Sequence, residues 1–170
     1  QYSEDSGQTF SEPGPIAIAD PCECCATRTY FSSTGDLYIG YREKENNQRD
    51  MHLLVRKKGA SKFTRRLLSQ TLWQIDACPM SGSSLMGDQD RLLAAWETKG
   101  AVYYGVADSE GHLLSDEIQE SETGHYPLVL PSASSHILAW KEDTTFVWQQ
   151  FAADGTPRSP ATRREDVSSH

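Results

Sequence analysis

Short runs of alternating apolar and polar residues recur along the whole chain, separated by Gly, Asn, Asp and Ser residues. Three of these runs are "GDLYIGYRE", "DRLLAAWET" and "SHILAWKE". Such alternation is typical of half-buried β-strands, and no helical apolar period persists over a comparable length. The pattern therefore predicts an all-β fold built from short antiparallel strands.

One run type returns three times with an aromatic residue at the same place. Tyr41, Trp96 and Trp140 recur at intervals of about 50 residues. A repeat of this length indicates four-stranded sheets arranged around an axis, as in a β-propeller. We expect each aromatic side chain on the second strand of its blade, packed in the core between blades. The three expected blades span about residues 20–70, 71–120 and 121–165.

The start of the chain has the pattern S-x-D-x-G-x-T-F, formed by Ser3, Asp5, Gly7, Thr9 and Phe10. Short polar side chains bond nearby backbone amides, glycine adopts positive φ, and an aromatic ring can anchor such a loop from beneath. The pattern predicts a β-hairpin turn. The related stretches "ADSEG" and "AADG" are expected between the third and outer strands of the later blades. Residues 1–19 would then end a preceding blade.

Three blades cannot tile a closed ring by ordinary sheet packing. The sequence therefore predicts a partner for this chain, namely the missing half of the propeller. That half could belong to the same chain, to a second copy or to a partner chain.

Composition and charge narrow the class of partner. Charged residues make up 24% of the chain and hydrophobic residues 37%, which is typical of a globular domain. The net charge of −8 argues against nucleic acid as a partner. No apolar run reaches the roughly 20 residues that span a bilayer, so we expect no transmembrane segment.

The motifs of the chain carry a family resemblance. "SEDSGQTF" matches the Asp-box, or BNR, repeat of sialidase-like six-bladed β-propellers. The ordered set "DPCECC", "NNQRDM", "WQIDACP" and "AVYYGVADSEG" resembles exported bacterial exo-sialidase-like proteins. The resemblance covers most of the chain, which is similar to the C-terminal half of that family's propeller. It implies a periplasmic or extracellular location.

The resemblance does not extend to catalysis. Sialidases hold the substrate carboxylate with three arginines and use a Tyr nucleophile assisted by Glu, with an Asp as acid/base. Their Arg-Ile-Pro motif is absent from this sequence. Catalytic candidates that no motif singles out are Arg42, Arg49, Glu97, Tyr103, Tyr104 and Tyr126.

One face of the predicted propeller gathers the polar candidates. Loops that enter inner strands or join second and third strands lie there, and ligands usually bind at this face of such folds. The expected ligand-binding residues are Arg42, Asn47, Arg49, Asp50, Asp76, Glu97, His125, Lys141 and Glu142. For Arg49 and Asp50, a salt bridge that ties the loop to the next blade is the structural alternative.

Four cysteines fall on the same face: Cys22, Cys24, Cys25 and Cys78. In propeller topology they precede neighbouring inner strands, so a disulfide from one of the first three to Cys78 is the favoured interpretation. A thiolate site for copper or zinc, with Met80, His52 or His125 nearby, is an alternative. Free buried thiols are a third possibility. The favoured interpretation needs no cofactor.

The predicted function is binding. The absent catalytic motif, the acidic composition and the cysteine cluster favour a scaffold or binding module that presents loops to a glycan, a protein or a larger assembly. A sialidase-like glycoside hydrolase acting on acidic sugars is the alternative, and a copper- or zinc-binding protein is a further one.

Overall fold

The computed structural model describes residues 1–16, 20–88, 90–132 and 135–165, and these residues form strands and loops. Residues 17–19, which end the segment expected to close a preceding blade, lie outside the described residues. None of the described residues forms a helix that could cross a membrane.

The strands group into three four-stranded sheets. The first contains β1 (Arg28–Phe31), β2 (Leu37–Arg42), β3 (Met51–Arg56) and β4 (Thr64–Leu67). The second contains β5 (Ser83–Asp88), β6 (Arg91–Thr98), β7 (Ala101–Asp108) and β8 (Ile118–Ser121). The third contains β9 (His125–Ser132), β10 (Ser135–Glu142), β11 (Thr145–Phe151) and β12 (Thr162–Glu165).

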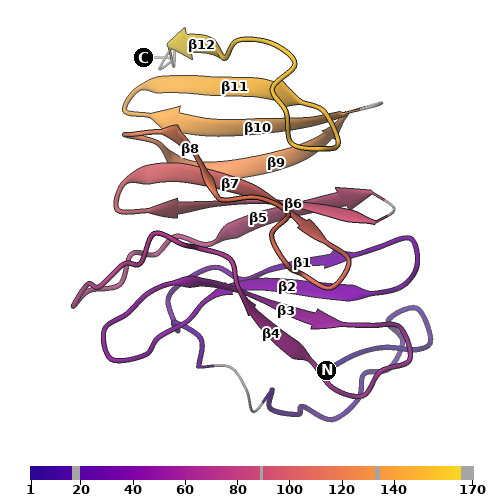
Figure 1. Ribbon diagram of the computed structural model, residues 1–170. Helices are drawn as coiled ribbons and strands as arrows, with labels where there is room; N and C mark the ends of the chain where they lie inside the picture. The colour runs from indigo at the N-terminus through magenta and orange to yellow at the C-terminus, as the bar shows by residue number, and fades with distance from the viewer. Residues whose placement is uncertain (17–19, 89, 133–134, 166–170) are drawn as a thin grey trace.

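Each sheet pairs consecutive strands in antiparallel register. Figure 1 shows the sheets stacked in chain order, with the first at the bottom and the third at the top. The first strand of the middle sheet, β5, contacts both β1 and β9. The predicted all-β fold of four-stranded antiparallel units is therefore confirmed.

The middle sheet is buried on both faces, which explains the nearly continuous apolar runs of β6 and β7. Successive side chains of a strand point to opposite faces. Leu92 and Ala94 pack toward the first sheet, whereas Leu93 and Ala95 pack toward the third. One strand thus contributes to two cores.

The recurring aromatic residues lie on β2, β6 and β10, the second strand of each sheet, as predicted. Trp96 is fully buried between the first and second sheets, and Trp140 between the second and third. Their expected role in packing between sheets is confirmed. Tyr41 is also buried, but its ring packs against His52 and its hydroxyl donates to Glu43.

The hydrogen bonds of the opening turn form as the sequence predicts, but residues 1–16 contain no strand, so the turn does not join two strands of a β-hairpin. The Asp5 carboxylate accepts from the backbone N–H and the hydroxyl of Thr9, and Ser3 Oγ accepts from the Gly7 N–H. Gly7 has φ of 87°. These bonds hold the pKa of Asp5 at about 2. The expected anchoring by Phe10 is wrong, because its side chain is 62% exposed and the turn is closed by hydrogen bonds instead.

Two related turns follow β7 and β11 and connect neighbouring sheets. The Asp108 carboxylate accepts from the backbone of His112, and that of Asp154 from the backbone of Thr156. The Tyr38 hydroxyl of the first sheet donates to the carbonyl of Ser109, and that of Tyr104 to the carbonyl of Gly155. The Asp-containing turns therefore fasten the sheets at the ends of the strands opposite the polar loops.

The outward faces of the first and third sheets expose large apolar side chains. Phe31 on β1 is 64% exposed and Phe146 on β11 is 49% exposed. Residues 1–16 run beside the first of these faces and leave a groove of about 800 Å³, lined by Ile16, Phe31 and Phe63 among others. These two faces differ from those of the middle sheet, which are covered on both sides.

Candidate functional site

The loops that contain the predicted ligand-binding residues meet at one end of the sheets. They are the β2–β3, β6–β7 and β10–β11 connections, together with the segments that lead into β1, β5 and β9. Two distinct regions form there. One is a buried corner between the first and second sheets, and the other is an open pocket at the loop end of the third sheet.

Arg42 occupies the centre of the buried corner. Only 1% of the residue is exposed. Its guanidinium donates to the backbone carbonyls of Arg49, Ser81 and Glu97 and to the Ser81 hydroxyl, at 2.5–3.2 Å. The Cζ atom of the guanidinium lies 5.1 Å from the centre of the Trp73 ring. Burial lowers the pKa of Arg42, but its usual value is so high that the side chain keeps its charge.

The other predicted residues of this corner hold the loops together. Asp50 is buried, and its carboxylate accepts from the backbone N–H of Trp73 at 2.8 Å. Arg49 is buried and donates to the Gln48 carbonyl. Within the described residues no salt bridge joins Arg49 to a carboxylate, so the loop is tied to the next sheet by the Asp50–Trp73 bond instead. Asn47 has φ of 63°, a turn conformation that asparagine tolerates.

Asp76 has an exposed side chain in the segment between β4 and β5, next to Ile75, whose backbone N–H donates to the Asn47 carbonyl. Two tyrosines named as possible nucleophiles, Tyr103 and Tyr104, are buried in the two cores on β7. Tyr104 has its pKa raised to about 12 by burial, so its hydroxyl remains protonated at neutral pH. Neither hydroxyl reaches the loop pocket: Tyr103 donates to Gln119 and Tyr104 to Gly155.

Glu97 and His125 link the corner to the pocket. The buried Glu97 carboxylate lies 3.1 Å from Nδ1 of His125, whose side chain is 46% exposed. The Glu97 backbone carbonyl meanwhile accepts from Arg42. A single residue of β6 therefore contacts both regions of the loop end.

The pocket has a volume of about 550 Å³ and is lined by Thr123, His125, Tyr126, Lys141, Glu142, Asp143 and Thr145. Sequence reasoning named His125, Tyr126, Lys141 and Glu142 but missed the other three. The structure thus brings together four predicted residues from β9 and from the end of β10.

Tyr126 is the unusual member of the pocket. Its φ is 55° and it is 73% exposed. It lies where the pairing of β9 with β10 shifts register, so that Tyr126 and Pro127 together face Trp140. In this kind of β-bulge the left-handed position is normally a glycine. A tyrosine there costs backbone energy and directs its ring away from the sheet.

Glu142 forms the wall of the pocket. Burial alone would raise its pKa, but hydrogen bonds from Arg163, Ser121 and Trp140 outweigh this effect and lower the pKa to about 2. The carboxylate is therefore ionised at neutral pH and already engaged by three donors. This arrangement fixes the end of β10 against β8 and β12.

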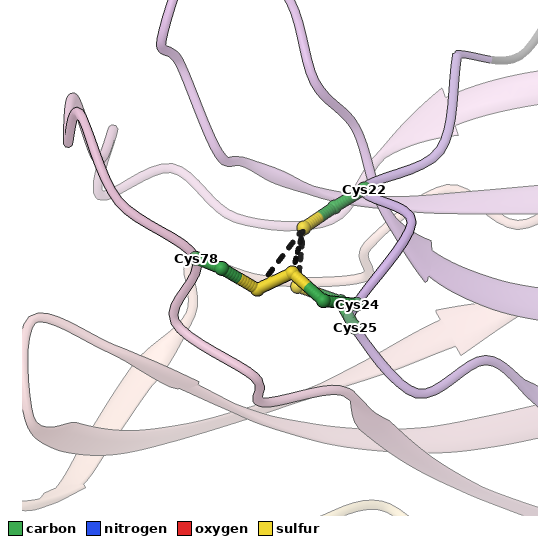
Figure 2. Close-up of side chains that lie close together, drawn as sticks. All are labelled: Cys22, Cys24, Cys25 and Cys78. Atoms are coloured by element: carbon green, nitrogen blue, oxygen red, sulfur yellow. Dashed lines mark hydrogen bonds between the residues drawn. A yellow bond between two sulfur atoms is a disulfide. The ribbon is translucent and has the colours of Figure 1, made fainter.

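The cysteines converge at the corner, as Figure 2 shows. Cys24 and Cys78 form a disulfide between the segments that lead into β1 and β5, which is one of the pairings expected from the sequence. Cys22 and Cys25 are buried and free, with their sulfurs 2.6 Å apart. Burial and the neighbouring Cys22 raise the pKa of Cys25 to about 11, so it is a poor nucleophile at neutral pH.

The chain matches no protein-family model and no curated protein. The resemblance to sialidase-like propellers therefore stays a prediction.

Proposed function

We propose that this chain is part of a sialidase-like β-propeller exported from a bacterium, and that it serves as a non-catalytic binding module for a glycan. The observation that carries the proposal is the Tyr126 pocket. An exposed aromatic ring at a bulge, surrounded by side chains that form hydrogen bonds, is suited to a sugar.

The pocket offers both kinds of contact that a pyranose ring needs. The face of the Tyr126 ring can pack against the C–H groups of the sugar, while its hydroxyl stays in water. Thr123, Thr145 and Asp143 supply donors and acceptors for sugar hydroxyls at the rim. Strained residues concentrate at functional sites, and Tyr126 is held in such a conformation.

The buried corner supports a non-catalytic role. A sialidase clamp must present guanidinium groups to the substrate carboxylate. Arg42 instead gives four hydrogen bonds to the protein itself, and Arg49 is 7% exposed. These two arginines could reach a substrate only if the loops around them separated.

The exposed apolar faces of the first and third sheets support the proposal of a larger propeller. Phe31 and Phe146 would be covered by neighbouring blades, just as both faces of the middle sheet are covered here. The missing half of the ring is therefore the partner that we propose for these faces. The Cys24–Cys78 disulfide is consistent with a periplasmic or extracellular location, where such bonds persist.

Glycan binding can be tested with a panel of immobilised neutral and sialylated oligosaccharides. We expect the native protein to bind at least one of them and Tyr126→Ala to lose at least about 80% of the signal, since one aromatic contact is worth more than about 1 kcal/mol. Tyr2→Ala removes another exposed tyrosine, outside the pocket, and should bind like the native protein. Failure to bind any sugar, or equal binding by Tyr126→Ala, would contradict the proposal. Turnover of a fluorogenic sialoside by the native protein would favour the hydrolase.

A further inference from the structure

We infer that the four cysteines of the buried corner form a zinc site when the protein is reduced. The ligands are the thiolates of Cys22, Cys24, Cys25 and Cys78. This inference concerns the corner and does not depend on glycan binding at the Tyr126 pocket.

The sulfur positions fit one metal ion. All four Sγ atoms lie within 4.8 Å of one another. In a tetrahedral zinc–thiolate site the Zn–S bonds are about 2.3 Å long, which places neighbouring sulfurs about 3.8 Å apart. Cys22 Sγ lies 3.6 Å from Cys24 Sγ and 3.9 Å from Cys78 Sγ. The sulfurs of Cys22 and Cys25, and those of Cys24 and Cys78, lie closer together. Side-chain rotation would bring these two pairs to the same spacing once the disulfide is reduced.

The local backbone also suits a metal. Cys22 and Cys25 form a Cys-x-x-Cys pair, the spacing that many structural zinc sites use. The backbone N–H of Cys25 donates to the Cys22 carbonyl at 3.1 Å, and this turn places both sulfurs on one side. Cys78 approaches from the segment before β5, so the ion would join two sheets. Cys24 and Cys78 are exposed, which gives the ion a path to the site.

Arg42 makes the charge of such a site favourable, and four converging sulfurs suit a tetrahedral Zn²⁺ ion. Four thiolates around Zn²⁺ carry a net charge of −2. The buried guanidinium interacts electrostatically with Cys25 and Cys22, and also with the carboxylates of Glu97 and Asp50. Among the described residues no carboxylate lies within ion-pair distance of it, since its hydrogen bonds go to carbonyls and a hydroxyl. A buried cation is stabilised by nearby negative charge, and a zinc–thiolate cluster would add to that of Glu97 and Asp50.

The Cys24–Cys78 disulfide and a zinc ion bound by all four thiolates cannot be present at the same time. A dithiol or phosphine reductant transfers two electrons to the Cys24–Cys78 bond, and two protons complete the two thiols. Zn²⁺ then replaces the four thiol protons, which are released to solvent. Reoxidation by a low-molecular-weight disulfide such as oxidised glutathione, which accepts two electrons and leaves as two thiols, re-forms the Cys24–Cys78 bond and removes two of the four ligands.

The test uses the full chain, reduced with a phosphine, desalted without oxygen and titrated with Co²⁺ and then Zn²⁺. We expect one ion per chain, the intense visible bands of tetrahedral cobalt, and thiolate-to-cobalt charge transfer of a strength that reports four sulfurs. Zn²⁺ should displace Co²⁺ and raise the melting temperature of the folded protein. Urea that unfolds the chain should weaken the binding.

Single substitutions define the ligands. Each of Cys22→Ser, Cys24→Ser, Cys25→Ser and Cys78→Ser should weaken zinc binding by more than about 100-fold. Glu4→Gln removes an exposed carboxylate in the opening turn, which contains none of the proposed ligands, and should leave the affinity unchanged. No uptake by the folded, reduced native protein would overturn the inference, and this result needs no variant to fold. Full affinity in any serine variant, binding unaffected by urea, or binding of Cu⁺ alone would also overturn it.

Discussion

The buried corner and the open pocket lie at the same end of this molecule, but their side chains differ in exposure and in what they contact. In the buried corner, Arg42 and Asp50 are enclosed and bond to backbone groups of the protein. In the open pocket, Tyr126 is exposed and held in a costly conformation. The corner has the features of a structural joint, whereas the pocket has those of a binding site. Polar residues at a loop end are therefore not equally available to a ligand.

The disulfide gives the largest expected effect on folding. Cys78→Ser opens the link between Cys24 and Cys78, which are 54 residues apart. For a loop of this length the chain-entropy model gives a loss of about 4 kcal/mol in the free energy of unfolding. Urea denaturation of the oxidised native and variant proteins measures the difference. Under reducing, metal-free conditions the two should become similar, and a difference that persists would show that the bond is not its cause.

Arg42→Met should destabilise the protein by about 3 kcal/mol, because it leaves several buried carbonyls without a donor. Urea denaturation again provides the measurement. The control is Arg65→Ala, whose side chain is 43% exposed and 3.5 Å from Glu43, so its loss should cost less than about 1 kcal/mol. Equal stabilities of the two variants would contradict the structural role of Arg42.

Tyr126→Gly should separate stability from binding. Glycine adopts the left-handed conformation without strain, so the variant should be more stable than the native protein by about 1 kcal/mol. It should nevertheless lose glycan binding, because the ring is gone. Thermal unfolding and oligosaccharide binding measure the two effects. A less stable Tyr126→Gly variant would mean that packing contacts of the Tyr126 ring stabilise the fold.

The last prediction concerns the stability of the protein in acid. The pKa of Glu142 is about 2 in the folded protein and near 4.5 in the unfolded chain, so the folded state favours its ionised form. This contribution is present above about pH 4.5 and is lost as the pH falls toward 2. Glu142→Gln should therefore be less stable than the native protein at pH 7, and the two should converge near pH 2. Parallel stability curves across this range would rule out the predicted linkage.

Much of the fold could be predicted because its determinants are local. Apolar alternation identified the strands, the recurring aromatics identified the second strand of each sheet, and the Ser3–Thr9 turn formed from its own side chains. The prediction for Phe10 was wrong because an aromatic ring is buried only where other residues pack against it. The described residues near Phe10 do not cover its ring. Sequence motifs carry no such information about packing partners.

The site was harder to predict because its contacts join distant segments. Arg42 reaches Ser81 and Glu97 across two sheets, which no spacing in the sequence reveals. The choice of Cys24 as the partner of Cys78 also depends on three-dimensional geometry. One available signal was overlooked: Pro127 in a strand indicates a bulge, and that bulge exposes Tyr126.

The division of the loop end into a joint and a binding pocket can be tested by one NMR titration. Backbone amide shifts of the native protein would be followed as the best-binding oligosaccharide from the panel is added. We expect the largest changes at residues 123–126 and 141–145, around the pocket. Changes confined to residues 42–50 and 73–81, or the absence of any change, would contradict the division.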